Sequence, residues 1–312
     1  MNQTYLSKYI RNKALDIGFS KIGFASPDMR NNNDQHILEW IDKKFHGQMN
    51  WIENRIEERL DIKKYYPEVK SIISVGLNYF TGNANNLENA GKISNYAWGD
   101  DYHLILKSHL YNLLDQIKKI EPKVDGVVCV DTSPIMEKEW AQKSGIGWIG
   151  KNTNIITTDF GSWIFLGELL INYELDYDSP FLIDHCGSCT ACLDACPTDA
   201  FSQPYVLDSN KCISYLTIEF RGDFDNIHNS SLNDWIYGCD ICQQVCPWNI
   251  SFSQMSTENR FNQRNTIANI KLTDWLNLDP IKFNKLFKNS PVKRTKYKGL
   301  LRNIKANLAN KK

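Results

Sequence analysis

The sequence lacks a long apolar run, an export signal and an excess of charge of one sign. Its most apolar stretch, Trp163 to Tyr173, is roughly half the length of a membrane-spanning helix and contains Glu168. The N-terminal segment has no continuous apolar region of the kind that a signal peptide needs. Lysine plus arginine and aspartate plus glutamate both total 36, which excludes a globally basic nucleic-acid binder but not a local basic patch. We therefore expect a cytoplasmic protein without a membrane segment.

Length and composition bound the architecture. The 312 residues allow two or three domains at roughly 100–200 residues each. Hydrophobic residues make up 42% and charged residues 23%, which argues against wholesale disorder or a coiled coil. The phosphate-binding pattern G-x4-G-K-S/T is absent. The G-x-G-x-x-G run at Gly145, Gly147 and Gly150 follows a predicted helix rather than a strand, so it is not a dinucleotide fingerprint.

Hydrophobic periodicity predicts alternating helices and strands in the first half of the chain. The predicted helices cover 4–17, 34–60, 102–120 and 134–143, and the predicted strands cover 22–25, 71–79, 126–130, 155–158 and 162–173, the last two as a hairpin. Strands interspersed with helices predict an α/β or α+β first domain over about 1–178. A cysteine-rich unit follows over 179–250, and a polar, then basic, segment covers 251–312.

Cysteine placement is the strongest signal. Eight of the nine cysteines fall between 186 and 246, which suggests metal binding rather than a disulfide framework in a chain without a secretion signal. The first motif is C-x2-C-x2-C-x3-C-P, the bacterial ferredoxin run. Its members are Cys186, Cys189, Cys192 and Cys196, followed by Pro197.

The second motif, C-x2-C-x3-C-P, is formed by Cys239, Cys242 and Cys246, and Cys212 can supply the ligand that it lacks. In two-cluster ferredoxins the last cysteine of each motif binds the other cluster. This crosswise sharing predicts two 4Fe–4S clusters without a spare ligand. Cluster one takes Cys186, Cys189, Cys192 and Cys246, and cluster two takes Cys196, Cys212, Cys239 and Cys242.

Zinc is the alternative for paired C-x2-C motifs. A zinc site needs neither the third cysteine at this spacing nor the trailing C-P, so the motifs favour iron–sulfur. The ninth cysteine, Cys129, lies between two valines in a predicted strand and is interpreted as a buried, inert thiol.

Three features before the clusters could belong to a ligand site. Asp131 ends an apolar strand, where it could face a ligand crevice or cap the following helix. The glycines around Trp148 could allow a flat ligand to approach or could serve turn geometry alone. His103 is, by itself, more often structural than catalytic, although the neighbouring Asp101 makes a hydrogen-bonding group plausible.

Several blocks together make the sequence recognisable. They are YAWGDDYH, VDTSPIMEKEWAQKSGIGWIGKNT, GSWIFLGELL, CGSCTACLDACPTDA, CISYLTIE and GCDICQQVCPWN. Over about residues 5–310 the chain resembles the epoxyqueuosine reductases, the cobalamin- and iron–sulfur-dependent enzymes of tRNA queuosine modification. Longer members of that family carry a C-terminal HEAT-like repeat domain, which we do not expect in this chain.

The resemblance implies an α+β fold. Its first domain would be of the cobalamin-binding type found in reductive dehalogenases and related to nitroreductases, followed by a bacterial-ferredoxin-like domain with two 4Fe–4S clusters and a basic helical C-terminus. It also implies that Asp131 is the proton donor, and burial would raise the pKa of such an acid. Asp101 and His103 would help to line the substrate cavity. The residues expected at the cobalamin are Arg55, Gly150, Lys151, Asn152, Ser162, Trp163, Ser214 and Asp240.

The C-terminal segment from Lys293 to Lys312 has eight lysines or arginines and no acid. Such runs usually form a solvated helix face. A local basic face on a neutral protein is also the footprint of phosphate binding, and the block matches the family pattern. We therefore expect contacts to the tRNA backbone, without base reading, from Lys293, Arg294, Lys296, Lys298 and Arg302.

The expected reaction converts the epoxide of epoxyqueuosine, at the wobble position of tRNA, to the alkene of queuosine. It consumes two electrons and two protons. A low-potential donor such as flavodoxin or ferredoxin would supply the electrons to a monomeric enzyme. The alternatives are a reductive dehalogenase, a small-molecule epoxide or nitro reductase, and an electron-transfer subunit without cobalamin.

Overall fold

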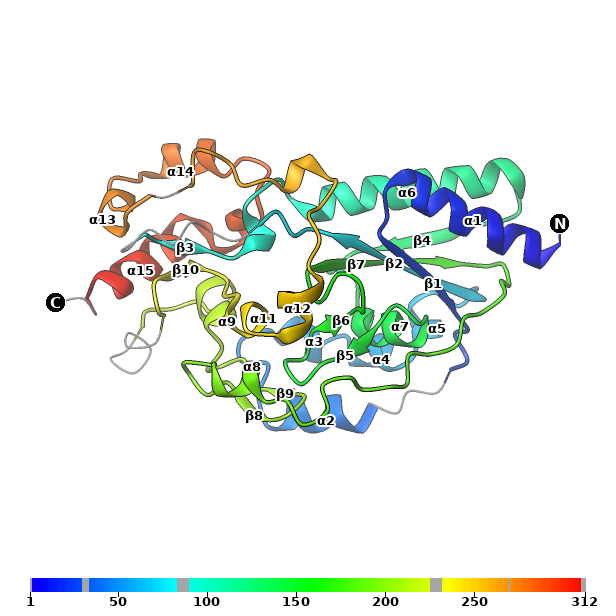
Figure 1. Cartoon of the computed structure of the whole chain (residues 1–312), viewed down its shortest axis with the longest axis horizontal. Coiled ribbons are helices and arrows are strands. Elements are labelled where there is room, and N and C mark those ends of the chain that lie inside the picture. Colours follow the sequence, from blue (N-terminus) through cyan, green and yellow to red (C-terminus); the bar gives the residue numbers. More distant parts are fainter. Residues whose placement is uncertain (1, 30–33, 83–89, 225–231, 269, 310–312) are drawn as a thin grey trace.

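A four-stranded antiparallel sheet organises the first part of the molecule (Figure 1). The computed structural model describes residues 2–29, 34–82, 90–224, 232–268 and 270–309. The strand order is β1-β2-β7-β4, with β1 at Lys21–Ala25, β2 at Ser71–Asn78, β7 at Ile164–Ile171 and β4 at Gly126–Cys129. Every residue of the central β2 is buried. The sheet is therefore covered on both faces.

Helices α1 (Gln3–Ile17) and α6 (Tyr102–Ile120) cover one face, and α7 (Glu137–Lys143) packs against the other (Figure 1). The main core lies between the sheet and the first pair, where Leu6 and Ile10 of α1 meet Leu106, Leu110 and Leu113 of α6. The predictions for α1, β1, β2, α6 and β4 are confirmed within a residue or two. In these segments the spacing of apolar residues matches the period of the helix or strand that forms.

Three element predictions are wrong in part. The stretch 34–60 is broken into α2 (Asp34–Asp42), α3 (Asn50–Glu53) and α4 (Ile56–Leu60), because Lys44 and Gly47 adopt left-handed backbone angles. The short α5 (Ile62–Tyr65) follows. Helix α7 begins at Glu137 rather than at 134, because residues 131–135 form tight turns.

The predicted hairpin of 155–158 with 162–173 is reduced to a single bridge between Thr157 and Gly161. Strand β7 pairs instead with β2 and β4, and β6 (Ile155–Ile156) pairs with β5 (Trp148–Ile149). The long apolar β7 thus fills the middle of the main sheet, which local spacing does not reveal.

The cysteine-rich unit consists of short helices and one small ribbon. They are α8 (Ala191–Asp194), β8 (Phe201–Gln203), β9 (Val206–Leu207), α9 (Ile213–Ile218), α11 (Ile241–Gln244) and α12 (Pro247–Phe252). Helices α8 and α11, one from each cysteine motif, contact each other. The two motifs are therefore brought together as the crosswise prediction requires.

The C-terminal segment packs around a parallel strand pair, β3 (Lys92–Ile93) with β10 (Trp235–Tyr237). It contributes α13 (Leu272–Trp275), α14 (Pro280–Leu286) and α15 (Lys296–Ala309), and the single turns η2 (Asn259–Phe261) and η3 (Pro291–Thr295), while η1 (Asn95–Ala97) follows β3. Leu300 and Ile304 of α15 share one core with Ile93 and Trp98. No helix in the described part of the chain has the length and apolar character needed to cross a bilayer.

The packing of α6 predicts a sharp contrast between two leucines of that helix. Leu113 is fully buried, so Leu113→Ala should lower the free energy of unfolding by about 2–5 kcal/mol. Leu104 is 58% exposed, so Leu104→Ala should change it by no more than about 0.5 kcal/mol. Urea unfolding followed by circular dichroism measures both, and equal losses would contradict this packing.

Candidate active site between the sheet and the cysteine-rich unit

A cavity of about 360 Å³ lies where the sheet domain meets the cysteine-rich unit. One side is apolar, with Ile155, Ile164, Phe165 and Leu166. Asp131 and Glu137 enter it from the segment after β4. Cys212, Cys239 and Cys242 border it from the cysteine-rich unit. Acid groups and predicted cluster ligands therefore face one space.

A strained turn holds Asp131 at this cavity. Its φ of 55° is uncommon for a residue with a side chain, although aspartate tolerates it better than most. Thr132 N donates to Val130 O across the turn, and Asp131 N donates to Glu137 Oε1 at 2.5 Å. Glu137 thus fixes the backbone of Asp131, and the Asp131 carboxylate is left facing the cavity.

His103 joins two carboxylates. Its Nε2 lies 3.0 Å from Asp131 Oδ2 and its Nδ1 lies 2.7 Å from Asp101 Oδ1. Asp101 also accepts the backbone N–H of His103 as the N-cap of α6. The sequence-predicted residues Asp101, His103 and Asp131 therefore form one hydrogen-bonded row.

Protonation within this row differs from the prediction. Burial would lower the pKa of His103, but the hydrogen bonds to Asp101 and Asp131 outweigh burial and raise it to about 9. Burial alone would raise the pKa of Asp131, yet the hydrogen bond and charge of His103 hold it below the ordinary value. The expectation of a raised pKa for Asp131 is therefore wrong. Instead, burial and the charge of Asp131 raise the pKa of Glu137 to about 8.

Only some of the residues expected at the cobalamin line the cavity. Asn152, Ser162 and Ser214 do. Ser162 is held by two amides of the second cysteine motif and the helix after it. Gln243 Nε2 donates to Ser162 Oγ at 3.0 Å, and Asn249 Nδ2 donates to the same oxygen at 2.8 Å.

Lys151 and Trp163, which were expected at the cobalamin, do not line the cavity, and their side chains make other contacts. Lys151 Nζ donates to the carbonyls of Gly187 and Cys189, so it fastens the first cysteine loop. Trp163 is 3% exposed and packs edge-on against Tyr79 in the main core.

Three further expected residues also lie outside the cavity wall. The Arg55 guanidinium pairs with Glu58. Gly150 occupies a tight turn, where a Cβ atom would come within 2.4 Å of Ile156. Asp240 is buried and accepts from Ser94 and from Asn95 N, and burial raises its pKa to about 6.

Thiols of the two cysteine motifs lie near one another. Burial raises the pKa of Cys192 to about 11, with added effects from the nearby Cys246, Cys186 and Cys189. Burial likewise raises the pKa of Cys242, with added effects from the nearby thiols of Cys212, Cys192 and Cys196. Such buried thiols resist ionisation unless a cation compensates their charge, which suits iron.

Two further observations bear on the metal. Within the described ranges, no three His, Cys, Asp or Glu side chains converge as ligands of a single ion would. Cys129 is fully buried on β4, and burial raises its pKa to about 12, in keeping with an inert thiol.

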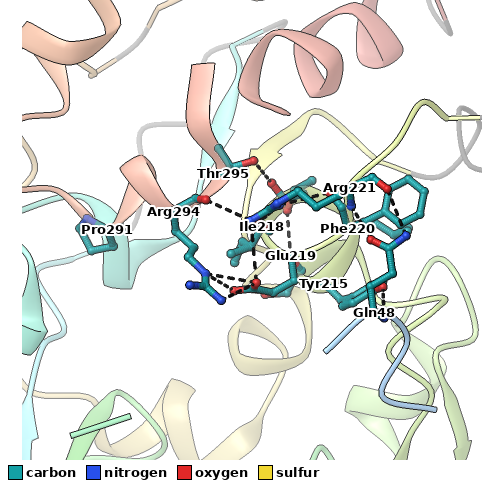
Figure 2. A network of polar contacts seen from close by, with 12 residues as sticks. Gln48, Tyr215, Ile218, Glu219, Phe220, Arg221, Pro291, Arg294 and Thr295 are labelled. Carbon is teal, nitrogen blue, oxygen red and sulfur yellow. Dashed lines mark hydrogen bonds and ion pairs between the residues drawn. The ribbon is translucent and has the colours of Figure 1, made fainter. Parts of the chain in front are cut away.

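The basic residues near the C-terminus have two kinds of surroundings: the lysines are exposed, and the arginines are hydrogen-bonded within the protein. Lys293, Lys296 and Lys298 are exposed. Figure 2 shows Arg294 held by Glu219, with Nε and Nη2 both donating to that carboxylate. The Arg294 guanidinium also lies 5.1 Å from the ring centroid of Trp51.

The hydrogen bonds of Arg302 contradict the phosphate contact expected for it. Its guanidinium donates to the carbonyls of Leu216, Phe220 and Gly222 and twice to the side chain of Asn303, which uses all five N–H donors. Arg302 therefore fastens α15 to the cysteine-rich unit and has no donor left for a phosphate.

Sequence reasoning missed Glu137, Lys138 and Gln243 at the cavity. Glu137 could have been noticed as a carboxylate at the start of the helix that follows Asp131. Gln243 stands inside the second cysteine motif, and its amide also donates to Tyr79 Oη at 3.2 Å. No local signal marks Lys138, because its place depends on the packing of the two units.

Two family models match parts of this chain, and a curated relative matches nearly all of it. Residues 59–132 match the family described as "Epoxyqueuosine reductase QueG, DUF1730", and residues 185–249 match the "4Fe-4S double cluster binding domain". An epoxyqueuosine reductase of Cellulophaga algicola is 41% identical over 298 residues, which cover 96% of each chain.

Two solved structures of epoxyqueuosine reductase superpose with a TM-score of 0.91 at 29% identity, covering 99% of this chain and 82% of theirs. One contains an epoxyqueuosine-modified tRNA-Tyr stem loop. The other, from Bacillus subtilis, has an aspartate catalytic loop swung out of the active site. By the near-full-length identity to its curated relatives, this chain belongs to the epoxyqueuosine reductase family.

Proposed function

We propose that this chain reduces epoxyqueuosine to queuosine in tRNA, with cobalamin as cofactor and two 4Fe–4S clusters as electron carriers. The observation that carries the proposal is the shared cavity. Asp131 and the thiols of Cys212, Cys239 and Cys242 border the same space. A reduction that consumes both protons and electrons needs both supplies at one place.

The cavity wall suits a corrin, which is a flat, largely apolar ring with amides at its edge. Ile155, Ile164 and Phe165 offer an apolar surface, and Asn152, Ser162 and Ser214 offer hydrogen-bonding groups beside it. When bound, cobalamin would supply a strongly nucleophilic reduced cobalt for attack on an epoxide carbon. The chain's own residues would orient the nucleoside, limit the entry of water and deliver protons.

Asp131 is proposed as the acid that protonates the departing epoxide oxygen. An alkoxide is a poor leaving group without such an acid. The strained turn and the hydrogen bond from Asp131 N to Glu137 keep this carboxyl at the cavity. The aspartate catalytic loop named for the Bacillus subtilis relative supports the same role.

The remaining proposals concern partners. The exposed Lys293, Lys296 and Lys298, with Arg294 held by Glu219, would contact tRNA phosphates. Cys189 is exposed, which supports a position of cluster one near the surface, where flavodoxin or ferredoxin would donate electrons. We propose a monomer that acts in the cytoplasm.

Asp131→Asn should lower kcat by at least about 100-fold, because the amide cannot donate the proton that opens the epoxide. Iron and cobalamin contents should be unchanged. Turnover of epoxyqueuosine-containing tRNA, read by nucleoside mass spectrometry, measures the effect. Asp125→Asn, on the exposed turn just before the same strand, is the control. Normal turnover by Asp131→Asn with intact cofactors would disprove the acid role.

Crosswise ligation predicts which cysteine variants resemble each other. Cys196→Ser and Cys239→Ser come from different motifs but should lose the same cluster, leaving about half of the iron. Cys192→Ser should lose the other one. Electron paramagnetic resonance of the reduced proteins compares the clusters that remain, and Cys129→Ala should keep both. A Cys196→Ser spectrum matching that of Cys192→Ser would favour ligation within each motif.

The basic segment predicts two kinds of variant. Lys298→Ala should weaken tRNA binding and reduce the slope of log affinity against log salt by about 1, as loss of a phosphate contact requires. The control is Lys282→Ala on α14, where Lys282 pairs with Asp279, and it should leave both tRNA affinity and the salt slope unchanged.

Arg302→Ala should instead lower the unfolding temperature, because buried carbonyls lose their donors. Salt-dependent binding and thermal unfolding distinguish the two kinds, and an unaltered salt slope in Lys298→Ala would count against its phosphate contact.

A further inference from the structure

The row Asp101–His103–Asp131 is built like a proton relay. His103 bridges the two carboxylates at 2.7 and 3.0 Å, and its side chain is 24% exposed. Asp101 is fixed as the N-cap of α6, and Asp131 is fixed by Glu137. Neither end of the row can move away without breaking a backbone hydrogen bond.

The charges around the row come from several elements. The ring of Tyr102 stacks on that of His103 with centroids 4.0 Å apart. Glu137 of α7 accepts the backbone N–H of Asp131, and the guanidiniums of Arg59 from α4 and Arg294 from η3 interact electrostatically with the Asp131 carboxylate. The imidazole itself is hydrogen-bonded only to carboxylates among the described residues, which favours the imidazolium.

The proposed reaction needs two protons, whereas one carboxyl group delivers one. The first proton turns the epoxide oxygen into a hydroxyl, and the second lets that hydroxyl leave as water. Asp131 is held as a carboxylate, so each proton has to reach it from a neighbouring donor. Nε2 of His103 lies 3.0 Å from Asp131 Oδ2.

We propose that His103 delivers both protons through Asp131, one after the other, while Asp101 holds the imidazole in place and stabilises its charge. This inference rests on the proposed function. In the first transfer, the Nε2–H bond of His103 breaks as an O–H bond forms on Asp131. That O–H bond then breaks as one forms on the substrate oxygen, and the epoxide C–O bond opens. Neutral His103 takes up a proton from solvent, and the same two steps carry the second proton to the hydroxyl. The remaining C–O bond breaks and water leaves.

The electrons are accounted for separately. The low-potential donor supplies the two electrons that complete the alkene. His103 recovers a proton from solvent after each of the two transfers, because solvent reaches its partly exposed ring. Each turnover thus consumes two protons and two electrons and restores the row.

The relay predicts a distinct pH dependence. The pKa of His103 is raised to about 9, so the imidazolium is present below that pH and is lost as the pH rises through it. The wild-type kcat should therefore fall above about pH 9. Asp101→Asn keeps a good N-cap but removes the charge, so this fall should move towards the ordinary histidine pKa of about 6.5.

His103→Gln should lower kcat by about 100-fold and abolish this limb of the pH profile, with little change in KM for tRNA. His109→Gln is the matched control, because His109 lies on the same helix but faces Arg260 and Glu258. The assay is multiple turnover of epoxyqueuosine-containing tRNA by holoenzyme with matched iron and cobalamin, from pH 6 to 10.

A shifted limb in Asp101→Asn supports the relay even if His103→Gln folds poorly. An unshifted limb, or full activity of His103→Gln, overturns it. If wild-type holoenzyme does not change the nucleoside at any pH, the proposed function fails instead, and this result is distinct from failure of the relay.

Discussion

The site depends on the hydrogen-bonded seam between the sheet domain and the cysteine-rich unit. Ser162 N donates to Asn249 Oδ1 at 2.6 Å, and Gln243 donates to both Ser162 and Tyr79. Asp240 accepts from Ser94 and Asn95 on the other side of the seam. Buried networks of this kind fix one arrangement, because any slip would strand polar groups away from water. The seam thereby sets the separation between the Asp131 turn and the thiols that border the cavity.

Electrostatics within the cavity favours a shared proton over a single acid. Glu137 is close enough to Asp131 that the two carboxyls do not both ionise readily. Because His103 lowers the pKa of Asp131, Asp131 ionises first and Glu137 keeps its proton to a higher pH. The same arrangement gives Asp131 a donor at hydrogen-bonding distance. A turn with positive φ at a residue with a side chain is costly for stability, as is common where function constrains the backbone.

The features that sequence reasoning predicted well are local. The double 4Fe–4S cluster domain follows from cysteine spacing, and α6 follows from an apolar period that runs without interruption from Tyr102 to Ile120. The features it missed depend on distant partners. Arg302 was expected to contact phosphate, but its guanidinium donates to the carbonyl of Leu216 in α9. Trp163 was expected to contact the cofactor, but it packs against Tyr79. The low pKa of Asp131 could not be foreseen either, because His103 lies 28 positions away in the chain.

The central claim is that this chain removes the epoxide oxygen of epoxyqueuosine with electrons and protons delivered to one cavity. The most direct test is anaerobic reconstitution with iron, sulfide and cobalamin, followed by nucleoside mass spectrometry of epoxyqueuosine-containing tRNA supplied with a low-potential reductant. The account predicts the loss of one oxygen's mass, and only when iron, sulfide and cobalamin are all present. Full binding of iron and cobalamin with an unchanged nucleoside would contradict it.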